Sequence, residues 1–211
     1  MQAEIITIGD ELLIGQVVDT NSAWLGRTLG EDGIKVTQIT SIQDDADQIS
    51  RTVNEALARV SIVLVTGGLG PTRDDITKHT LAELFGMRLV RDEQVYETVR
   101  RQLAVRGIAF NELNRGQALV PDGCTVLPNR NGTAPGMWFE RGGKILVSMP
   151  GVPFEMKALV TDEVLPRLRT HFSLHANVHR TAITFGLAES ILAERIAPWE
   201  AVLGAKVKVP T

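Results

Sequence analysis

The chain alternates short β-branched apolar runs with longer segments of helical periodicity, and this alternation constrains its fold more than any other feature. Residues 4–9, 35–42 and 61–66 have the pattern of strands, and a segment with apolar residues at helical spacing follows each of them. A parallel pair of strands needs a long crossover connection, which a helix usually supplies. The sequence therefore predicts an α/β fold built on a mostly parallel central sheet.

Capping signals mark where two of the predicted helices begin. Asn21 is a candidate N-cap for a helix over residues 21–31. Asp45 is followed three residues later by Gln48, which is the spacing of a capping box. A second helix is therefore expected to begin after Asp45.

The second half of the chain contains a hairpin signal and a helix that a proline interrupts. Residues 137–141 and 144–149 are strand-like and are joined by two glycines, which is typical of a two-residue hairpin turn. A helical pattern follows from residue 154 to about residue 170. Because proline lacks the N–H of a helix interior, Pro166 is expected to kink or end this helix early.

Composition and charge exclude several classes of function. The 211 residues are 44% apolar and 22% charged, and 22 basic against 25 acidic residues give a net charge of −3. Such a chain has no overall positive field to recruit nucleic acid or an anionic membrane. The longest purely apolar run is four residues, and the single cysteine, Cys124, permits no internal disulfide. We therefore expect a cytoplasmic protein, with neither nucleic acid nor membrane as its partner.

The pattern changes after residue 170. Residues 1–170 are long enough for one α/β domain, whereas residues 171–211 contain one strand-like and one helix-like segment. About 40 residues rarely form a core of their own without disulfides or metals. The last segment is therefore interpreted as part of a second small domain that is truncated or packs on the first.

Acidic pairs and glycines follow the predicted strands. Asp10–Glu11, Asp44–Asp45 and Asp74–Asp75 come after the first, second and third strands, and glycines stand at positions 67, 68 and 70. Open α/β sheets bind ligands beyond the carboxyl ends of their strands, and glycines before a helix N-terminus suit a phosphate. Carboxylates repel a phosphate unless a cation lies between them, so the pattern favours a divalent metal such as Mg²⁺ or Mn²⁺.

Each acidic residue also has a structural interpretation without chemistry. Asp45 and Asp75 are well placed to cap helices, and Asp10, Glu11 and Asp74 are equally explained as solvated loop charges. For any one of them, the two interpretations have similar weight.

Four segments are more specific than these patterns. The loop GGLGPTRDD at 67–75 opens into a helix, and GDELLIG at 9–15, NGTAPG at 131–136 and MPGVPFEM at 149–156 accompany it in this order. The loop resembles that of the molybdopterin-binding domain, and together the four resemble the N-terminal domain of CinA, the competence/damage-inducible protein family. FGLAES at 185–190 resembles the start of the small middle domain of KH type in that family.

The resemblance implies a three-layer α/β/α domain that binds a nucleotide-like ligand. It also implies an ADP-ribose pyrophosphatase: metal-dependent hydrolysis of ADP-ribose, or a related dinucleotide diphosphate, to AMP and ribose 5-phosphate, with Mg²⁺, Mn²⁺ or Co²⁺. The nicotinamide-nucleotide amidase activity of a CinA C-terminal domain is not expected, because no segment here corresponds to it. Leu69 departs from the threonine that molybdopterin proteins commonly carry, which disfavours molybdopterin chemistry.

The motifs give the candidate site by resemblance. The residues expected to bind the metal and activate a water are Asp75, Asp44 and Asp10. The residues expected to bind substrate are Gly67, Gly68, Leu69, Gly70, Pro71, Thr72, Arg73, Asn21, Asn131, Gly132, Pro150, Gly151 and Glu155.

Two further functions use the same pocket. The first is a non-catalytic molybdopterin- or nucleotide-binding module of a larger CinA-type protein, and the second is molybdopterin adenylylation, which Leu69 disfavours. Relatives of this fold assemble through flat apolar faces, so a homo-oligomer, most simply a homodimer, is expected.

Overall fold

The structure is a computed structural model that describes residues 1–69, 76–174 and 185–203. The chain divides into two compact units, Met1–Asn177 and Val178–Thr211. The first unit contains the sheet and the candidate site.

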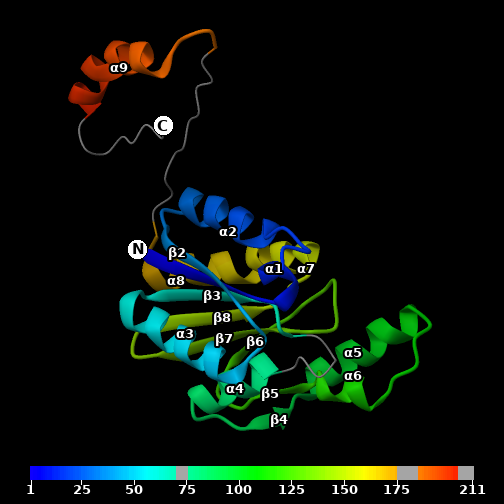
Figure 1. The fold of residues 1–211 in the computed structure, drawn as a ribbon. Coiled ribbons are helices and arrows are strands. Elements are labelled where there is room, and N and C mark those ends of the chain that lie inside the picture. The colour runs from blue at the N-terminus through cyan, green and yellow to red at the C-terminus, as the bar shows by residue number, and fades with distance from the viewer. Residues whose placement is uncertain (70–75, 175–184, 204–211) are drawn as a thin grey trace. The chain divides into compact units, whose positions relative to one another are not determined.

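A six-stranded sheet forms the centre of the first unit, in the order β2-β1-β3-β8-β7-β6 (Figure 1). Strands β1 (Gln2–Ile8), β2 (Lys35–Ile42), β3 (Ile62–Thr66) and β8 (Lys144–Met149) run parallel to one another. Strands β7 (Gly136–Arg141) and β6 (Thr125–Leu127) continue the sheet in antiparallel pairing. The predicted mostly parallel α/β sheet is confirmed.

Alternation along the strands divides the apolar core between the two faces of the sheet. Ala3 and Ile5 of β1 belong to one core, beneath helices α2 (Thr20–Glu31), α7 (Pro153–Leu159) and α8 (Leu165–Phe172). Ile6 and Ile8 belong to the opposite core, beneath α3 (Ala46–Arg59) and α4 (Ile76–Leu84). Helices therefore cover both faces, and the fold has three α/β/α layers (Figure 1).

Capping side chains fix the starts of α2 and α3. The carboxylate of Asp45 accepts a hydrogen bond from the backbone N–H of Gln48 at 2.9 Å, so Asp45 caps α3 as predicted. The prediction for α2 is wrong, because Asp19 caps this helix by accepting from the N–H of Ser22 at 2.9 Å. The side chain of Asn21 is thereby released for another contact.

The helix that contains Pro166 does not end there. It passes from α7 through a π-helical turn, Val160–Val164, into α8, and Pro166 occupies the first turn of α8. Since the missing N–H of proline is tolerated in a first turn, the wider π turn lets the chain restart an α-helix around the proline. Of the two expected outcomes, a kink or an early end, the early end is wrong, and the regular α-helix is instead interrupted by the π-helical turn before Pro166.

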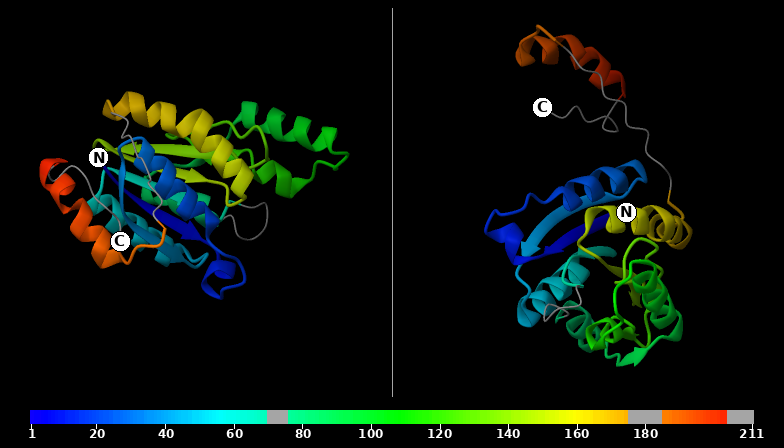
Figure 2. Two further views of the ribbon diagram at one scale, coloured as in Figure 1. Left: turned by 90° about the horizontal axis from the view of Figure 1, so that it is seen from above. Right: turned by 90° about the vertical axis from the view of Figure 1, so that its right-hand side faces the viewer.

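The segment between α4 and β6 forms a small excursion with its own core, drawn in green in Figures 1 and 2. Strands β4 (Leu89–Arg91) and β5 (Leu119–Pro121) pair antiparallel, and α5 (Glu93–Val105) and α6 (Glu112–Gly116) lie between them in sequence. Val95, Val99 and Leu103 of α5 pack against Ala118 and Val120.

In the second unit, the described residues form one helix, α9 (Glu189–Leu203). Apolar side chains of this unit, such as Trp199 and Val202, are largely exposed. Among the described residues of the chain, no helix is both long enough and apolar enough to cross a membrane.

Candidate functional site

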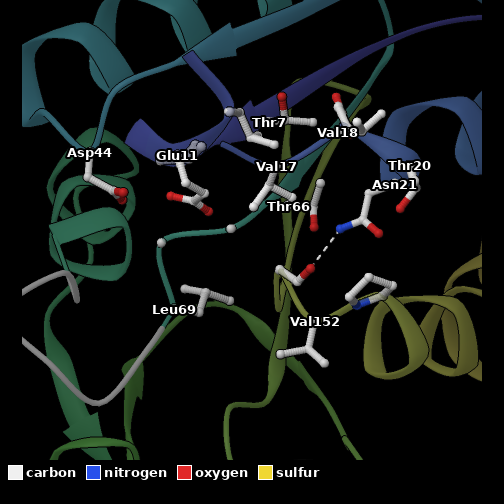
Figure 3. Close-up of a pocket in the computed structure, with 17 residues that line it drawn as sticks. Thr7, Glu11, Val17, Val18, Thr20, Asn21, Asp44, Thr66, Leu69 and Val152 are labelled. Carbon is white, nitrogen blue, oxygen red and sulfur yellow. Dashed lines mark hydrogen bonds between the residues drawn. The ribbon is translucent and has the colours of Figure 1, made fainter. Parts of the chain in front are cut away.

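A pocket of about 420 Å³ lies where β1 and β3 end, beside the loop that follows β8 (Figure 3). Thr7 and Ile8 of β1, Thr66 of β3 and Gly151 after β8 line it. In parallel α/β sheets, the carboxyl ends of the strands meet at one edge and leave a crevice there. We call this cavity the main pocket.

Three glycines form the floor of the main pocket, and two of them are crowded. A Cβ atom built on Gly67 would lie 2.0 Å from the carbonyl oxygen of Ile8, and one on Gly68 would lie 2.1 Å from Oγ1 of Thr77. A Cβ on Gly151 would lie 3.3 Å from the Cα of Gly67. Side chains do not fit at these positions, so no side chain covers the backbone. A ligand can therefore approach the backbone closely.

Two carboxylates stand at one end of the main pocket. Glu11 comes from the short helix α1 (Asp10–Leu13), and Asp44 from the turn before α3. Figure 3 shows the two carboxylates on the same side of the pocket. Because a carboxylate only accepts hydrogen bonds, this end suits a ligand edge that carries N–H donors.

Asn21 lies at the opposite end of the pocket and links α2 to the loop after β8 by a hydrogen bond. Its Nδ2 donates to the carbonyl oxygen of Gly151 at 2.7 Å, the dashed line in Figure 3. Its Oδ1 atom is buried and has no hydrogen-bond partner among the described residues. This amide oxygen is available to accept a hydrogen bond from a ligand.

Apolar side chains surround these polar groups. Val17, Val18 and Val152 line the main pocket and are 51%, 79% and 43% exposed. Leu12 and Leu69 complete this wall. A flat heterocycle could bury its faces here while its edge meets the carboxylates.

The structure brings six of the predicted site residues to the main pocket: Asn21, Asp44, Gly67, Gly68, Leu69 and Gly151. Five others, Gly70, Pro71, Thr72, Arg73 and Asp75, lie outside the described residues. Asp10 is exposed at the start of α1 and does not line the pocket. Pro150 is buried next to Gly151, and its carbonyl oxygen accepts a hydrogen bond from Thr66.

Asn131, Gly132 and Glu155 form a structural contact away from the main pocket. Asn129 donates to Glu155 Oε2 at 2.7 Å and accepts from the N–H groups of Asn131 and Gly132, both at 3.0 Å. A Cβ on Gly132 would lie 1.9 Å from Glu155 Oε2, so glycine is required for this packing. These residues hold the loop before β7 against the start of α7.

Sequence reasoning missed several lining residues. Val17 and Val18 lie in the segment between α1 and α2, which has no periodic pattern. Thr20 is the first residue of α2, and Thr7 and Thr66 resemble ordinary strand residues. The position of Thr7 and Thr66 is the one signal in the sequence that could identify them as pocket residues, because both lie at the end of a predicted parallel strand.

The predicted metal site is incomplete in the described part of the chain. No three His, Cys, Asp or Glu side chains there form a group that could hold a metal ion. Asp44 lines the main pocket and Asp10 does not. The divalent metal therefore stays a prediction.

The fold and the pocket define a class: a three-layer α/β domain that binds its ligand at the carboxyl edge of a parallel sheet. A family described as "probable molybdopterin binding domain" matches residues 4–170. The chain belongs to this family, as a CinA N-terminal, molybdopterin-binding-like domain.

Individual relatives agree with this assignment. A CinA-like protein of Cytophaga hutchinsonii is 49% identical over 201 residues, which cover 95% of this chain and 48% of that protein. The crystal structure of the protein CinA with unknown function from Thermoplasma acidophilum has a TM-score of 0.70 and 36% identity, and covers 76% of this chain and 94% of that one. The molybdopterin biosynthesis enzyme MoaB of Thermus thermophilus shares the fold, with a TM-score of 0.54 and 19% identity over 82% of this chain and 96% of that one. The chain spans about half the length of the curated relatives it matches.

The names of these relatives contradict the predicted enzymatic activity. The relatives are named as CinA-like or molybdopterin biosynthesis proteins and not as ADP-ribose pyrophosphatases. The site agrees with this, since Asp10, one of three residues expected to activate a water, does not line the main pocket. The expectation of metal-dependent ADP-ribose hydrolysis is therefore wrong, and the alternative of a binding module in a CinA-type protein agrees better with the relatives.

Proposed function

We propose that this domain is a binding module for a pterin of the molybdopterin class. The observation that carries the proposal is the glycine floor formed by Gly67, Gly68 and Gly151 beneath a pocket of about 420 Å³. That volume is within the range of about 300–1,000 Å³ that small-molecule sites occupy. The family description supports the pterin class.

The chemistry of the pocket supports a pterin ring. A pterin has an exocyclic amine and a ring N–H on one edge, and Glu11 and Asp44 offer acceptors at one end of the pocket. The ring faces would lie against Val17, Val18 and Val152. Guanine presents a similar donor edge, so a guanine nucleotide is the closest competing ligand.

Calorimetric titration with molybdopterin, GMP and AMP tests the proposal. Val18 lines the pocket and is 79% exposed, so Val18→Trp blocks the pocket without disturbing the core. Binding is expected to weaken by about tenfold or more, since a bulky ring excludes the ligand from its apolar wall. Val105→Trp is the matched control, because Val105 is 84% exposed on α5 and does not line the pocket.

Two results would contradict the proposal. One is binding that Val18→Trp and Val105→Trp change equally, because the ligand would then lie elsewhere. The other is molybdopterin that binds no better than AMP, because the carboxylate end would then not select a donor edge. Recovery of the ligand by chromatography, unchanged in mass, is expected of a binding module.

A further inference from the structure

A buried hydroxyl lies directly behind the floor of the main pocket. Thr77, the second residue of α4, is 0% exposed, and its Oγ1 atom has no hydrogen-bond partner among the described residues. A buried hydroxyl without a partner has lost its hydrogen bonds to water and gained none in return, which destabilises the fold. Apolar packing alone therefore does not explain a threonine at this position.

The hydroxyl of Thr77 faces a carboxylate beside Gly68. A Cβ atom built on Gly68 would lie 2.1 Å from Thr77 Oγ1 and 2.9 Å from Asp44 Oδ1. The hydroxyl and the carboxylate therefore border the same space, which a side chain at position 68 would fill. Because this residue is glycine, no side chain separates the two groups.

Asp44 connects this space to the main pocket. Its carboxylate lines the pocket at the turn before α3 (Figure 3), whereas Thr77 does not line the pocket. A carboxylate can accept about four hydrogen bonds on its two oxygens, so Asp44 can accept one from Thr77 without giving up another contact. Thr77 can therefore influence a ligand through Asp44 without touching it.

A second buried threonine on the same helix has a different environment. Thr80 is 7% exposed, and its Oγ1 donates to the carbonyl oxygen of Ile76 at 2.8 Å. A bond to the preceding turn is a common way for a threonine inside a helix to satisfy its hydroxyl. Thr77 makes no such bond within the described part of the chain, so its hydroxyl is available to another acceptor.

We propose that Thr77 is a positioning residue for Asp44. When a ligand binds, the Thr77 O–H donates to Oδ1 of Asp44, and Oδ2 of Asp44 accepts an N–H from the edge of the ligand. The hydroxyl thereby fixes the plane of the carboxylate in the orientation that the ligand requires. The identity of the ligand rests on the proposed function, whereas the pairing of Thr77 with Asp44 requires only a ligand that donates to this carboxylate.

An isosteric replacement of Thr77 tests this role. Thr77→Val keeps the branched shape and removes the hydroxyl, so the affinity for molybdopterin and for GMP, measured by calorimetric titration, is expected to fall about tenfold. Thr77→Ser keeps the hydroxyl and should bind within about threefold of wild type. Unchanged affinity in Thr77→Val would overturn the proposal.

The unfolding temperature of the ligand-free protein distinguishes positioning from a structural role. Because the hydroxyl has no partner before the ligand binds, Thr77→Val should leave the unfolding temperature unchanged or raise it while it weakens binding. Thr80→Val is the matched control, because it removes a hydroxyl that is bonded; it should lower the unfolding temperature and leave the affinity unchanged. If Thr77→Val lowers the unfolding temperature as much as Thr80→Val does, the hydroxyl supports the fold and the proposal is overturned.

A double-mutant cycle with Asp44→Asn shows whether the effect passes through the carboxylate. Asp44→Asn removes the charge that strengthens the bond from Thr77, so Thr77→Val should change the remaining affinity by about twofold or less in that background. A tenfold effect of Thr77→Val that persists in Asp44→Asn would overturn the proposed route.

The two ligands distinguish failure of this proposal from failure of the proposed function. Binding of GMP but not of molybdopterin, with the tenfold loss in Thr77→Val, would support the role of Thr77 and contradict the proposed pterin. Binding of molybdopterin that Thr77→Val leaves unchanged would do the reverse. Wild type that binds neither ligand would contradict both proposals.

Discussion

Two pairs of adjacent glycines show two different reasons for having glycine. Gly67 and Gly68 on the pocket floor have φ values of +108° and +65°, and Gly142 and Gly143 in the β7–β8 turn have +59° and +75°. A Cβ built on either floor glycine would collide with neighbouring atoms, whereas one on either turn glycine would meet nothing within 4 Å. Backbone conformation explains the turn pair, while the floor pair also needs the absence of a side chain.

Gly67→Ala is expected to have the largest effect. Its Cβ would lie 2.0 Å from the carbonyl oxygen of Ile8, a backbone atom at the end of a buried strand that cannot turn aside. With the strain of a positive φ added, the free energy of unfolding should fall by about 4 kcal/mol, and ligand binding should be lost. Urea unfolding followed by circular dichroism measures the first effect, and calorimetry the second.

Gly26→Ala is the matched control for that experiment. Gly26 lies within α2, its Cβ would meet nothing within 4 Å, and its φ is not positive. Since alanine is favoured over glycine inside a helix, this variant should be more stable by about 0.5–1 kcal/mol. Loss of stability in both variants would show that crowding is not what distinguishes Gly67.

Gly68→Ala should cost less, because its obstacles are side chains. The new Cβ would lie 2.1 Å from Thr77 Oγ1 and 2.9 Å from Asp44 Oδ1. We expect a loss of about 2–3 kcal/mol. In a double-mutant cycle, Thr77→Ala should recover about 1 kcal/mol of that loss, because it removes the closest atom.

Additivity of the Gly68→Ala and Thr77→Ala effects would contradict this explanation. The alternative would be that φ alone makes Gly68 necessary, and the floor pair would then resemble the turn pair. Thr77→Ser is the matched control, because it keeps the hydroxyl and should recover less than Thr77→Ala does.

The turn pair also shows what could be predicted from sequence. Two glycines between alternating strands indicate a hairpin by local rules, and the structure has β7 and β8 joined at Gly142 and Gly143. Asp45 and Gln48 likewise predict a helix start from four adjacent residues. Predictions of this kind succeed because all the interacting groups lie close together in the chain.

The floor pair shows what could not be predicted. The atoms that crowd Gly67 and Gly68 belong to Ile8, Asp44 and Thr77, which three different elements bring to one place. The same limit applies to Glu155 and Gly132, which the motifs predict at the substrate and which the structure places against each other, outside the main pocket. Long-range packing decides whether a motif residue faces the pocket or supports it.

Gly143→Ala should have a smaller effect. The new Cβ would have open space, so only the left-handed φ of +75° opposes it, at a cost of about 1 kcal/mol. Gly143→Asn should cost about half of that, because asparagine tolerates this conformation better. Urea midpoints with an unchanged slope, together with unchanged ligand affinity, would agree; a loss as large as that of Gly67→Ala would remove the distinction between the pairs.

Gly123→Ala is expected to have the smallest effect, although its Cβ would also lie close to another atom. The contact is to Met87 Cε at 2.8 Å, the far end of a flexible side chain, so the cost should be about 0.5 kcal/mol or less.

The neighbouring Cys124 provides a local measurement, since burial raises the pKa of its thiol to about 11 from an ordinary value near 9. At pH 8 its thiolate population, and hence alkylation by iodoacetamide, should be about a hundredfold below that of an exposed cysteine. Because burial favours the neutral thiol, the folded state loses stability as pH rises from about 9 to about 11. Slow alkylation in both wild type and Gly123→Ala would show that the Met87 side chain moves aside without exposing Cys124. Fast alkylation in the variant alone would show that Met87 does not adjust to the new Cβ. Crowding would then act at Gly123 as it does at Gly67.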